Sequence, residues 1–108
     1  MGVKGAKITQ GSVLAAEQIV QKLSSISDIS AKKMFGGHGI FHTGKMFGII
    51  DSKGTAYLKV DISNQKDYEK NGASKHGKMP YYSIPDTVFD DVDTLLLWVK
   101  KSIEISKK

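Results

Sequence analysis

A run of short, strand-like segments between residues 29 and 60 constrains the fold more than any other feature of the sequence. Glycine-containing turns or breaks separate the segments, and the expected strands are Ile29–Phe35, Gly39–His42, Lys45–Ile50 and Thr55–Val60. Short strands joined by tight turns pair with their neighbours in antiparallel fashion, because parallel pairing needs a long crossover. The sequence therefore predicts an antiparallel β-meander in the middle of the chain.

Amphipathic helices are expected on both sides of this meander. Ser12 is the expected N-cap of the first helix, and apolar residues follow it at helical spacing: Ala16, Ile19, Val20 and Leu23. Asp90 is the expected N-cap of the second helix, which runs to about Ser106 along the stripe Leu95, Leu96, Val99 and Ile103. The pattern predicts an α+β fold, in which an antiparallel sheet is flanked by an N-terminal and a C-terminal helix.

Two smaller elements are expected between the meander and the last helix. Residues Asn64–Asn71 have the composition of a short polar helix that is anchored by Tyr68. Met79–Ile84 is the expected last strand, and Pro80 places it at an edge of the sheet because proline donates no ladder hydrogen bond. Because neighbouring strand residues point to opposite faces, one tyrosine of the pair Tyr81 and Tyr82 is expected in the core and the other at the surface.

Length and composition indicate one small domain. The chain has 108 residues, and its first eleven are rich in glycine and lysine, so we expect a flexible tail over residues 1–11 and a single domain over residues 12–108. The absence of cysteine favours a reducing compartment. No stretch has the features of a signal peptide or a membrane span, so we expect a cytoplasmic location and no membrane partner.

The chain is basic, but it contains no arginine. The net charge is +5, and all 16 basic residues are lysines. Arginine is the residue that reads guanine edges and clamps phosphates in a bidentate manner. Its absence argues against a sequence-specific reader of nucleic acid, whereas nonspecific binding of phosphates by lysine stays open.

The usual catalytic and metal-binding patterns are missing. His38 and His42 lie four residues apart in a strand-like segment, which separates them by about 13 Å and prevents joint ligation of one metal ion. The glycines of residues 36–39 lead into a strand, whereas a phosphate-binding loop leads into a helix. A bend or bulge in the sheet is the favoured interpretation, and a bound anion near Lys32, Lys33 and His38 stays open. We predict no catalytic residue, metal site or cofactor.

Several motifs together carry a family resemblance. The segment Lys33–Phe41, with the sequence KMFGGHGIF, resembles the signature of the TfoX (Sxy) N-terminal domain family. Further segments follow in the order of that family: residues 45–50, 57–61, 79–85 and 90–99. The match extends from about Glu17 to Ser106. Lys32 and His38 depart from it, since arginine and tyrosine are expected there in many relatives.

The resemblance implies an α+β domain without known enzymatic activity. Full-length members are bacterial competence regulators with a second, helical domain, and this chain stops where that domain would begin. We therefore expect a stand-alone N-terminal domain that acts as a non-enzymatic regulatory or binding module through protein–protein contacts, as a homodimer. The expected interaction surface consists of Lys33, Phe35, Gly37, His38, Lys59 and Tyr82. The alternative is a nucleic-acid accessory domain that binds phosphates through its lysines, and an enzyme is the least favoured class.

Overall fold

The structure is a computed structural model, and it describes residues 10–34 and 36–108. Its centre is a five-stranded antiparallel sheet: β1 (Ile29–Met34), β2 (Gly37–His42), β3 (Lys45–Ile50), β4 (Ala56–Lys59) and β5 (Tyr81–Ser83). The order in the sheet, β1-β2-β3-β4-β5, is the order in the chain. The predicted antiparallel meander is therefore confirmed, with a fifth strand added at the edge where Pro80 placed it.

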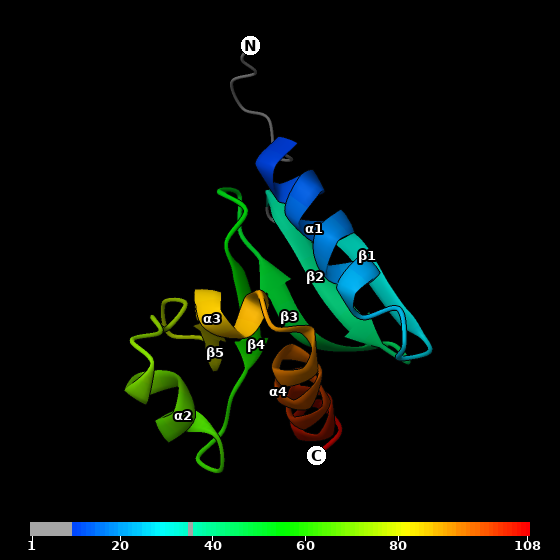
Figure 1. The fold of residues 1–108 in the computed structure, drawn as a ribbon. Helices are drawn as coiled ribbons and strands as arrows, with labels where there is room; N and C mark the ends of the chain where they lie inside the picture. Colours follow the sequence, from blue (N-terminus) through cyan, green and yellow to red (C-terminus); the bar gives the residue numbers. More distant parts are fainter. Residues whose placement is uncertain (1–9, 35) are drawn as a thin grey trace.

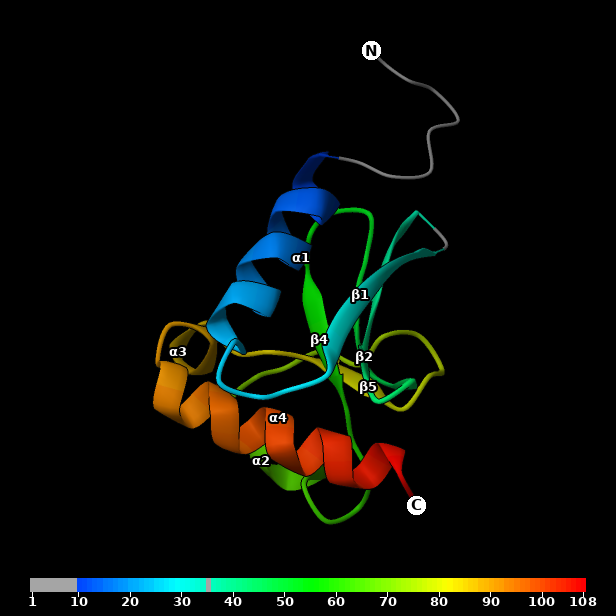
Figure 2. The ribbon, with the colours of Figure 1, turned by 90° about the vertical axis from the view of Figure 1, so that its right-hand side faces the viewer.

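The two long helices cover one face of this sheet. α1 (Gln10–Lys22) contacts β1, β2 and β3, and α4 (Val92–Ser106) contacts β3 and β4. Figures 1 and 2 show α1, α3 (Asp86–Phe89) and α4 on the same side of the strands, whereas the opposite side carries no helix. α2 (Gln65–Lys70) lies at the end of the sheet near α4. The predicted α+β fold with flanking helices is confirmed.

The helix starts differ from the sequence prediction. α1 begins at Gln10, so Ser12 is not an N-cap but a buried residue inside the first turn. The expected tail over residues 1–11 falls largely on residues 1–9, which lie outside the described part of the chain. α4 is capped by Asp91 and not by Asp90, because Asp90 ends the unpredicted helix α3. The Asp91 side chain accepts hydrogen bonds from the backbone N–H and the hydroxyl of Thr94.

The glycines of residues 36–39 do not interrupt the sheet. Gly36 has a φ of 83°, which suits the turn before β2, and Gly37 and Gly39 are regular members of β2. Gly37 is required by close packing, since a Cβ atom there would lie 1.9 Å from the carbonyl oxygen of Ile50 in β3. The prediction that these glycines separate two strands is confirmed at Gly36, which lies in the turn between β1 and β2. The second strand begins at Gly37 and not at Gly39, because Gly37 and Gly39 both pair with β1.

A β-bulge brings an extra residue into the core. Ile40 pairs with Gly48, and the next residue Phe41 pairs with Met46, so the pairing passes over Phe47. Phe47 is fully buried in the hydrophobic core, while Met46 points to the other face near Gly39. A bulge can re-aim a side chain in this way because two residues oppose one on the partner strand. The irregularity predicted at the glycines is therefore found just after them, between Ile40 and Phe41, with the extra residue in β3.

The core lies between the sheet and the helices. Its fully buried large side chains come from α1, the strands, α2 and α4: Ile19, Leu23, Ile40, Phe47, Ile50, Leu58, Tyr68, Leu95 and Val99. Tyr81 and Tyr82 point to opposite faces of β5, yet both are buried, so the prediction of one exposed tyrosine is wrong. The Tyr81 hydroxyl lies 3.4 Å from the carbonyl oxygen of Met46, which ties β5 to β3 on the face without helices.

We expect the substitution Gly37→Ala to reduce the free energy of unfolding by about 3 kcal/mol, because the new methyl group meets a backbone atom that cannot move alone. Gly39→Ala is the matched control in the same strand. Its Cβ would first meet the flexible ends of Met34 and Met46, so a loss of about 1 kcal/mol or less is expected. Urea unfolding of both variants measures the difference, and equal losses would contradict the argument.

Candidate functional site

A buried polar contact joins α1 to the glycine-rich strand β2. The Ser12 hydroxyl and His38 Nδ1 lie 2.8 Å apart, and both residues are almost completely buried. The sequence did not suggest this pair, since Ser12 was expected to cap its own helix. Two polar groups that satisfy each other inside the domain fix the position of the helix on the strand.

The environment of His38 keeps its imidazole neutral. Burial lowers the pKa of His38 below its usual value of 6.5, and the ammonium group of Lys33 lowers it further. Lys33 is the cross-strand partner of His38 in the β1–β2 hairpin. A catalytic serine–histidine pair needs a carboxylate that orients the histidine, and the charge that acts on His38 within the described residues is a lysine. The pair therefore has the character of a structural link.

The face of the sheet opposite the helices, here called the open face, carries half-buried apolar side chains. A Cβ atom on Gly39 would lie close to the sulfur atoms of Met34 and Met46 and to the ring of Phe41. Because glycine has no side chain, these three side chains surround a depression in the sheet surface. The Lys32 ammonium lies 5.2 Å from the centre of the Phe41 ring, within reach of a cation–π contact. Apolar, aromatic and basic groups thus share the open face.

A groove of about 300 Å³ crosses the open face and is lined by Met34, Met46, Ile49, Ile50, Asp51, Ser52, His76 and Met79. The loop before β5 forms one of its walls. His76 packs on the ring of Tyr57 with centroids 4.5 Å apart, and Lys75 makes an isolated bridge with Tyr82. Methionine side chains adapt to varied apolar surfaces, and three of them in one groove suit the binding of a protein segment.

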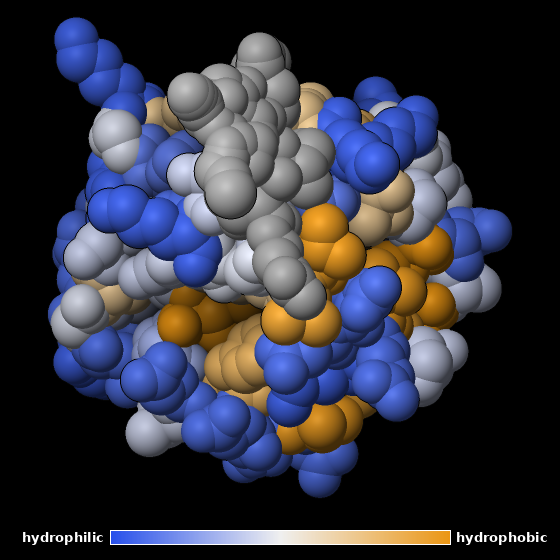
Figure 3. All heavy atoms as spheres, turned by 90° about the horizontal axis from the view of Figure 1, so that it is seen from above, coloured by the Kyte–Doolittle hydropathy of each residue, from blue (hydrophilic) through white to orange (hydrophobic). Residues whose placement is uncertain are grey.

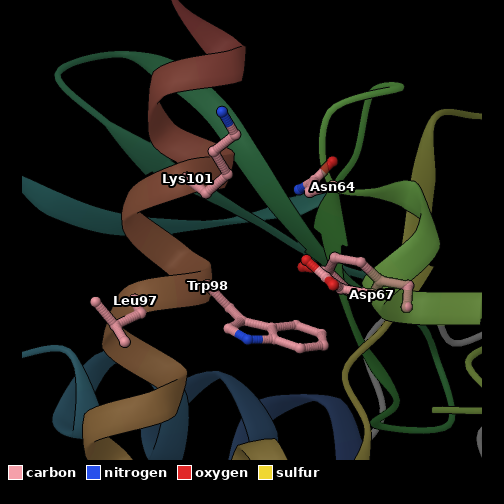
Figure 4. A pocket seen from close by; sticks show the side chains of 6 residues that line it. Asn64, Asp67, Leu97, Trp98 and Lys101 are labelled. Atoms are coloured by element: carbon pink, nitrogen blue, oxygen red, sulfur yellow. The ribbon is translucent and has the colours of Figure 1, made fainter. Parts of the chain in front are cut away.

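A smaller hollow lies between α2 and α4. Its volume is about 160 Å³, and Trp98 forms one side, opposite Asn64 and Asp67 (Figure 4). Trp98 packs against Tyr68 with ring centroids 4.5 Å apart. The volume is below the range of about 300–1,000 Å³ that is typical of ligand sites. We interpret this hollow as a gap between packed helices.

The end of the molecule where α1 begins has a third hollow. It is lined by residues of α1, β4 and α3 together with the turn before β4: Ala15, Gln18, Gly54, Thr55, Ala56, Ile84, Asp86 and Phe89. Viewed from this end, apolar patches lie among polar residues on the coloured part of the surface (Figure 3). Neither charge nor aromatic residues gather there in a way that indicates a particular ligand.

The structure describes five of the six residues expected to form an interaction surface, and they lie in two separate parts of the sheet. Lys33 is exposed on β1, while its neighbour His38 and also Gly37 are buried in β2. Lys59 and Tyr82 lie on β4 and β5, away from that hairpin, and Tyr82 is buried with its hydroxyl 3.5 Å from Glu69. Phe35 lies outside the described residues.

The open face was not predicted from the sequence. Its main contributors, Met34, Gly39, Phe41 and Met46, belong to the same hairpin and its neighbour strand. A signal was available, because apolar residues occupy both alternating positions of these strands, as in Phe41 and Ile40. A strand with one solvated face alternates apolar with polar residues, so apolar residues on both faces indicate a second covered surface.

Among residues 10–34 and 36–108, no group of three or more His, Asp or Glu side chains could hold a metal ion. None of the described helices is both long and apolar enough to span a bilayer.

The architecture defines the chain as a small α+β domain, a meander sheet with helices on one face. A family model for the TfoX N-terminal domain matches residues 21–106, and the chain therefore belongs to that family, which is linked to competence regulators. The resemblance noted in the sequence is thereby confirmed. No curated protein matches the chain.

We expect His38 to make the stability of the domain depend on pH. Its folded pKa is depressed, so the unfolded chain binds a proton first, and the free energy of unfolding falls as the pH drops below about 6.5. Well above that pH the contribution of His38 is constant, since the residue is then neutral in both states. Urea unfolding between about pH 7.5 and about pH 5.5 measures this slope.

The variant His38→Gln should lose this slope, because glutamine does not titrate. His76→Gln is the control, since His76 lies at the groove and not against Ser12. A slope that persists unchanged in His38→Gln would contradict the assignment.

Proposed function

We propose that this chain is a non-enzymatic regulatory module, related to the bacterial competence regulators, that binds a partner protein through the open face. The observation that carries the proposal is the open face itself. One face of the sheet is closed by α1 and α4, whereas the other presents a groove with three methionines and the half-buried ring of Phe41.

The composition of the open face supports a protein partner. Protein interfaces are enriched in aromatic residues and methionine at their centre. The groove has Met34, Met46 and Met79 in it, and the rings of Tyr57 and Tyr81 lie on the same face. The buried Ser12–His38 contact lies on the other face of β2, so it is separated from the groove and supports the strand from behind.

Photo-crosslinking tests this assignment. A benzoyl-phenylalanine replaces Phe41 on the open face in one variant and Leu97, which is 68% exposed on α4, in the control. We expect the variant at position 41 to form a covalent adduct with a protein in the cells that make the chain, and unlabelled native chain should compete for it. Adducts of equal amount from position 97 would contradict the assignment to the open face.

The alternative is a nucleic-acid accessory domain, and one observation favours it. Lys32 lies over the half-buried ring of Phe41, and a lysine beside an accessible aromatic ring suits a stacked base with its phosphate. A titration with oligothymidine at two salt concentrations tests this function. Binding that falls steeply with salt would support it, and no detectable binding at low salt would remove it.

The homodimer expected from the sequence stays a prediction. Edge strands provide unpaired backbone groups that can join two chains. Light scattering over a wide range of protein concentration tests this point, and a strict monomer at the highest concentration would exclude the homodimer.

A further inference from the structure

We infer that the partner binds by strand addition: an extended, acidic segment of another protein pairs with the free edge of β1. This inference rests on the proposed function and specifies the chemistry of the partner. Three observations carry it, namely the unpaired edge of β1, the charge of the β1–β2 hairpin, and the continuity of this edge with the groove.

The outer edge of β1 is open for hydrogen bonding. β1 is the first strand of the sheet, and no described strand pairs with its outer side. Its residues 30–33 are exposed. The Thr43 N–H donates to the carbonyl oxygen of Asp28, and hydrogen-bonded pairs alternate along an antiparallel ladder. Ser30 and Lys32 therefore bond inward to β2, whereas the backbone groups of Ala31 and Lys33 point outward.

The opposite edge of the sheet is less suited to an added strand. β5 has only three residues, and Tyr82 at its centre already makes an isolated bridge with Lys75. β1 has six residues, which gives several outward backbone groups in one row. Recognition by strand addition takes its affinity from such main-chain groups and its specificity from alternate side chains.

The charge of the hairpin favours an acidic segment. Residues 29–42 contain Lys32 and Lys33 but no aspartate or glutamate. Lys32 points to the open face, where it lies over Phe41, and Lys33 points to the face of His38. Opposite charges on neighbouring strands stabilise a pair, and like charges destabilise it. An added strand with two adjacent carboxylates would place one beside each lysine.

The same charges disfavour a second copy of this chain at β1. Two β1 strands side by side would bring four lysines together, and β1 itself supplies no carboxylate to balance them. Lysines on an edge strand are a known means by which proteins avoid pairing with themselves. An acidic strand from a different protein removes this conflict.

The edge and the groove form one continuous surface. Met34 ends β1 and also lines the groove, and Lys32 lies on the same face two residues before it. Side chains of an added strand that point to the open face would therefore lie beside Ser30, Lys32 and Met34 of β1. An apolar residue near Met34 and an acidic residue near Lys32 complete the recognition pattern.

A synthetic peptide tests the inference directly. The probe is a capped, fluorescent peptide with the sequence Val-Glu-Glu-Val-Val-Glu-Glu-Val, whose glutamate pairs point to both faces of a strand. We expect fluorescence polarisation to show saturable binding to the full chain. A peptide with lysine in place of every glutamate should not bind, and a peptide with N-methyl groups on its four valines should bind at least about tenfold more weakly.

Variants of the chain provide the matched comparison. Reversal of the edge charge with Lys32→Glu and Lys33→Glu should weaken binding by about tenfold or more, whereas Lys66→Glu and Lys70→Glu on α2 should leave it within about twofold. Ala31→Pro removes an outward N–H and should abolish binding. Far-UV circular dichroism checks that each variant is folded. The N-methylated peptide tests the backbone hydrogen bonds of the added strand without any change to the chain.

Three outcomes would overturn strand addition. Equal binding of the N-methylated peptide would show that no ladder forms, and equal binding of the edge and α2 charge variants would show that the site lies elsewhere. A dimer that dissociates on Ala31→Pro would make a second copy the occupant of this edge. If crosslinking from position 41 succeeds while the peptide fails, strand addition alone is rejected, and the failure of both rejects the proposed function as well.

Discussion

The close approach of β2 to β3 is the constraint on which the structure depends. At Gly37 the backbone of β2 lies so near the carbonyl group of Ile50 that no Cβ atom fits between them. The next residue, His38, contacts Ser12 of α1 on the face that the helices cover. Gly39 has no side chain, which leaves a depression in the open face between Met34, Met46 and Phe41. Residues 37–39 thereby set the spacing of β2 and β3, the position of α1 on the sheet and the shape of the open face.

The two faces of the sheet differ in what covers them. The covered face is closed by α1 and α4, and the bulge at Phe47 adds an aromatic ring to its core. The open face receives no helix, yet it is largely apolar and the loop with His76 and Met79 covers only part of it. Helices therefore close one face of the sheet, and the other face is the surface to which we assign the binding of a partner.

The fold was predictable from the sequence because the signals were local. Strand alternation and tight turns gave β3 its bounds, Lys45–Ile50, and apolar spacing indicated both long helices. The predictions were wrong where tertiary packing overrode the local structural preference of a residue. Ser12 has the chemistry of an N-cap, but its hydroxyl serves His38, which is 26 residues away. The burial of Gly37 and Tyr82 was not foreseen for the same reason, since it depends on strands that are distant in the chain.

The Ser12–His38 contact also matters for how the domain is bounded. The family model matches from residue 21, whereas α1 begins at Gln10 and supplies Ala16 and Ile19 to the hydrophobic core. The helix is thus an integral layer of the domain although most of it precedes the matched region. A fragment cut at residue 21 would expose apolar surface on β2 and leave the imidazole of His38 without its serine, so in this chain the packed domain extends beyond the matched region.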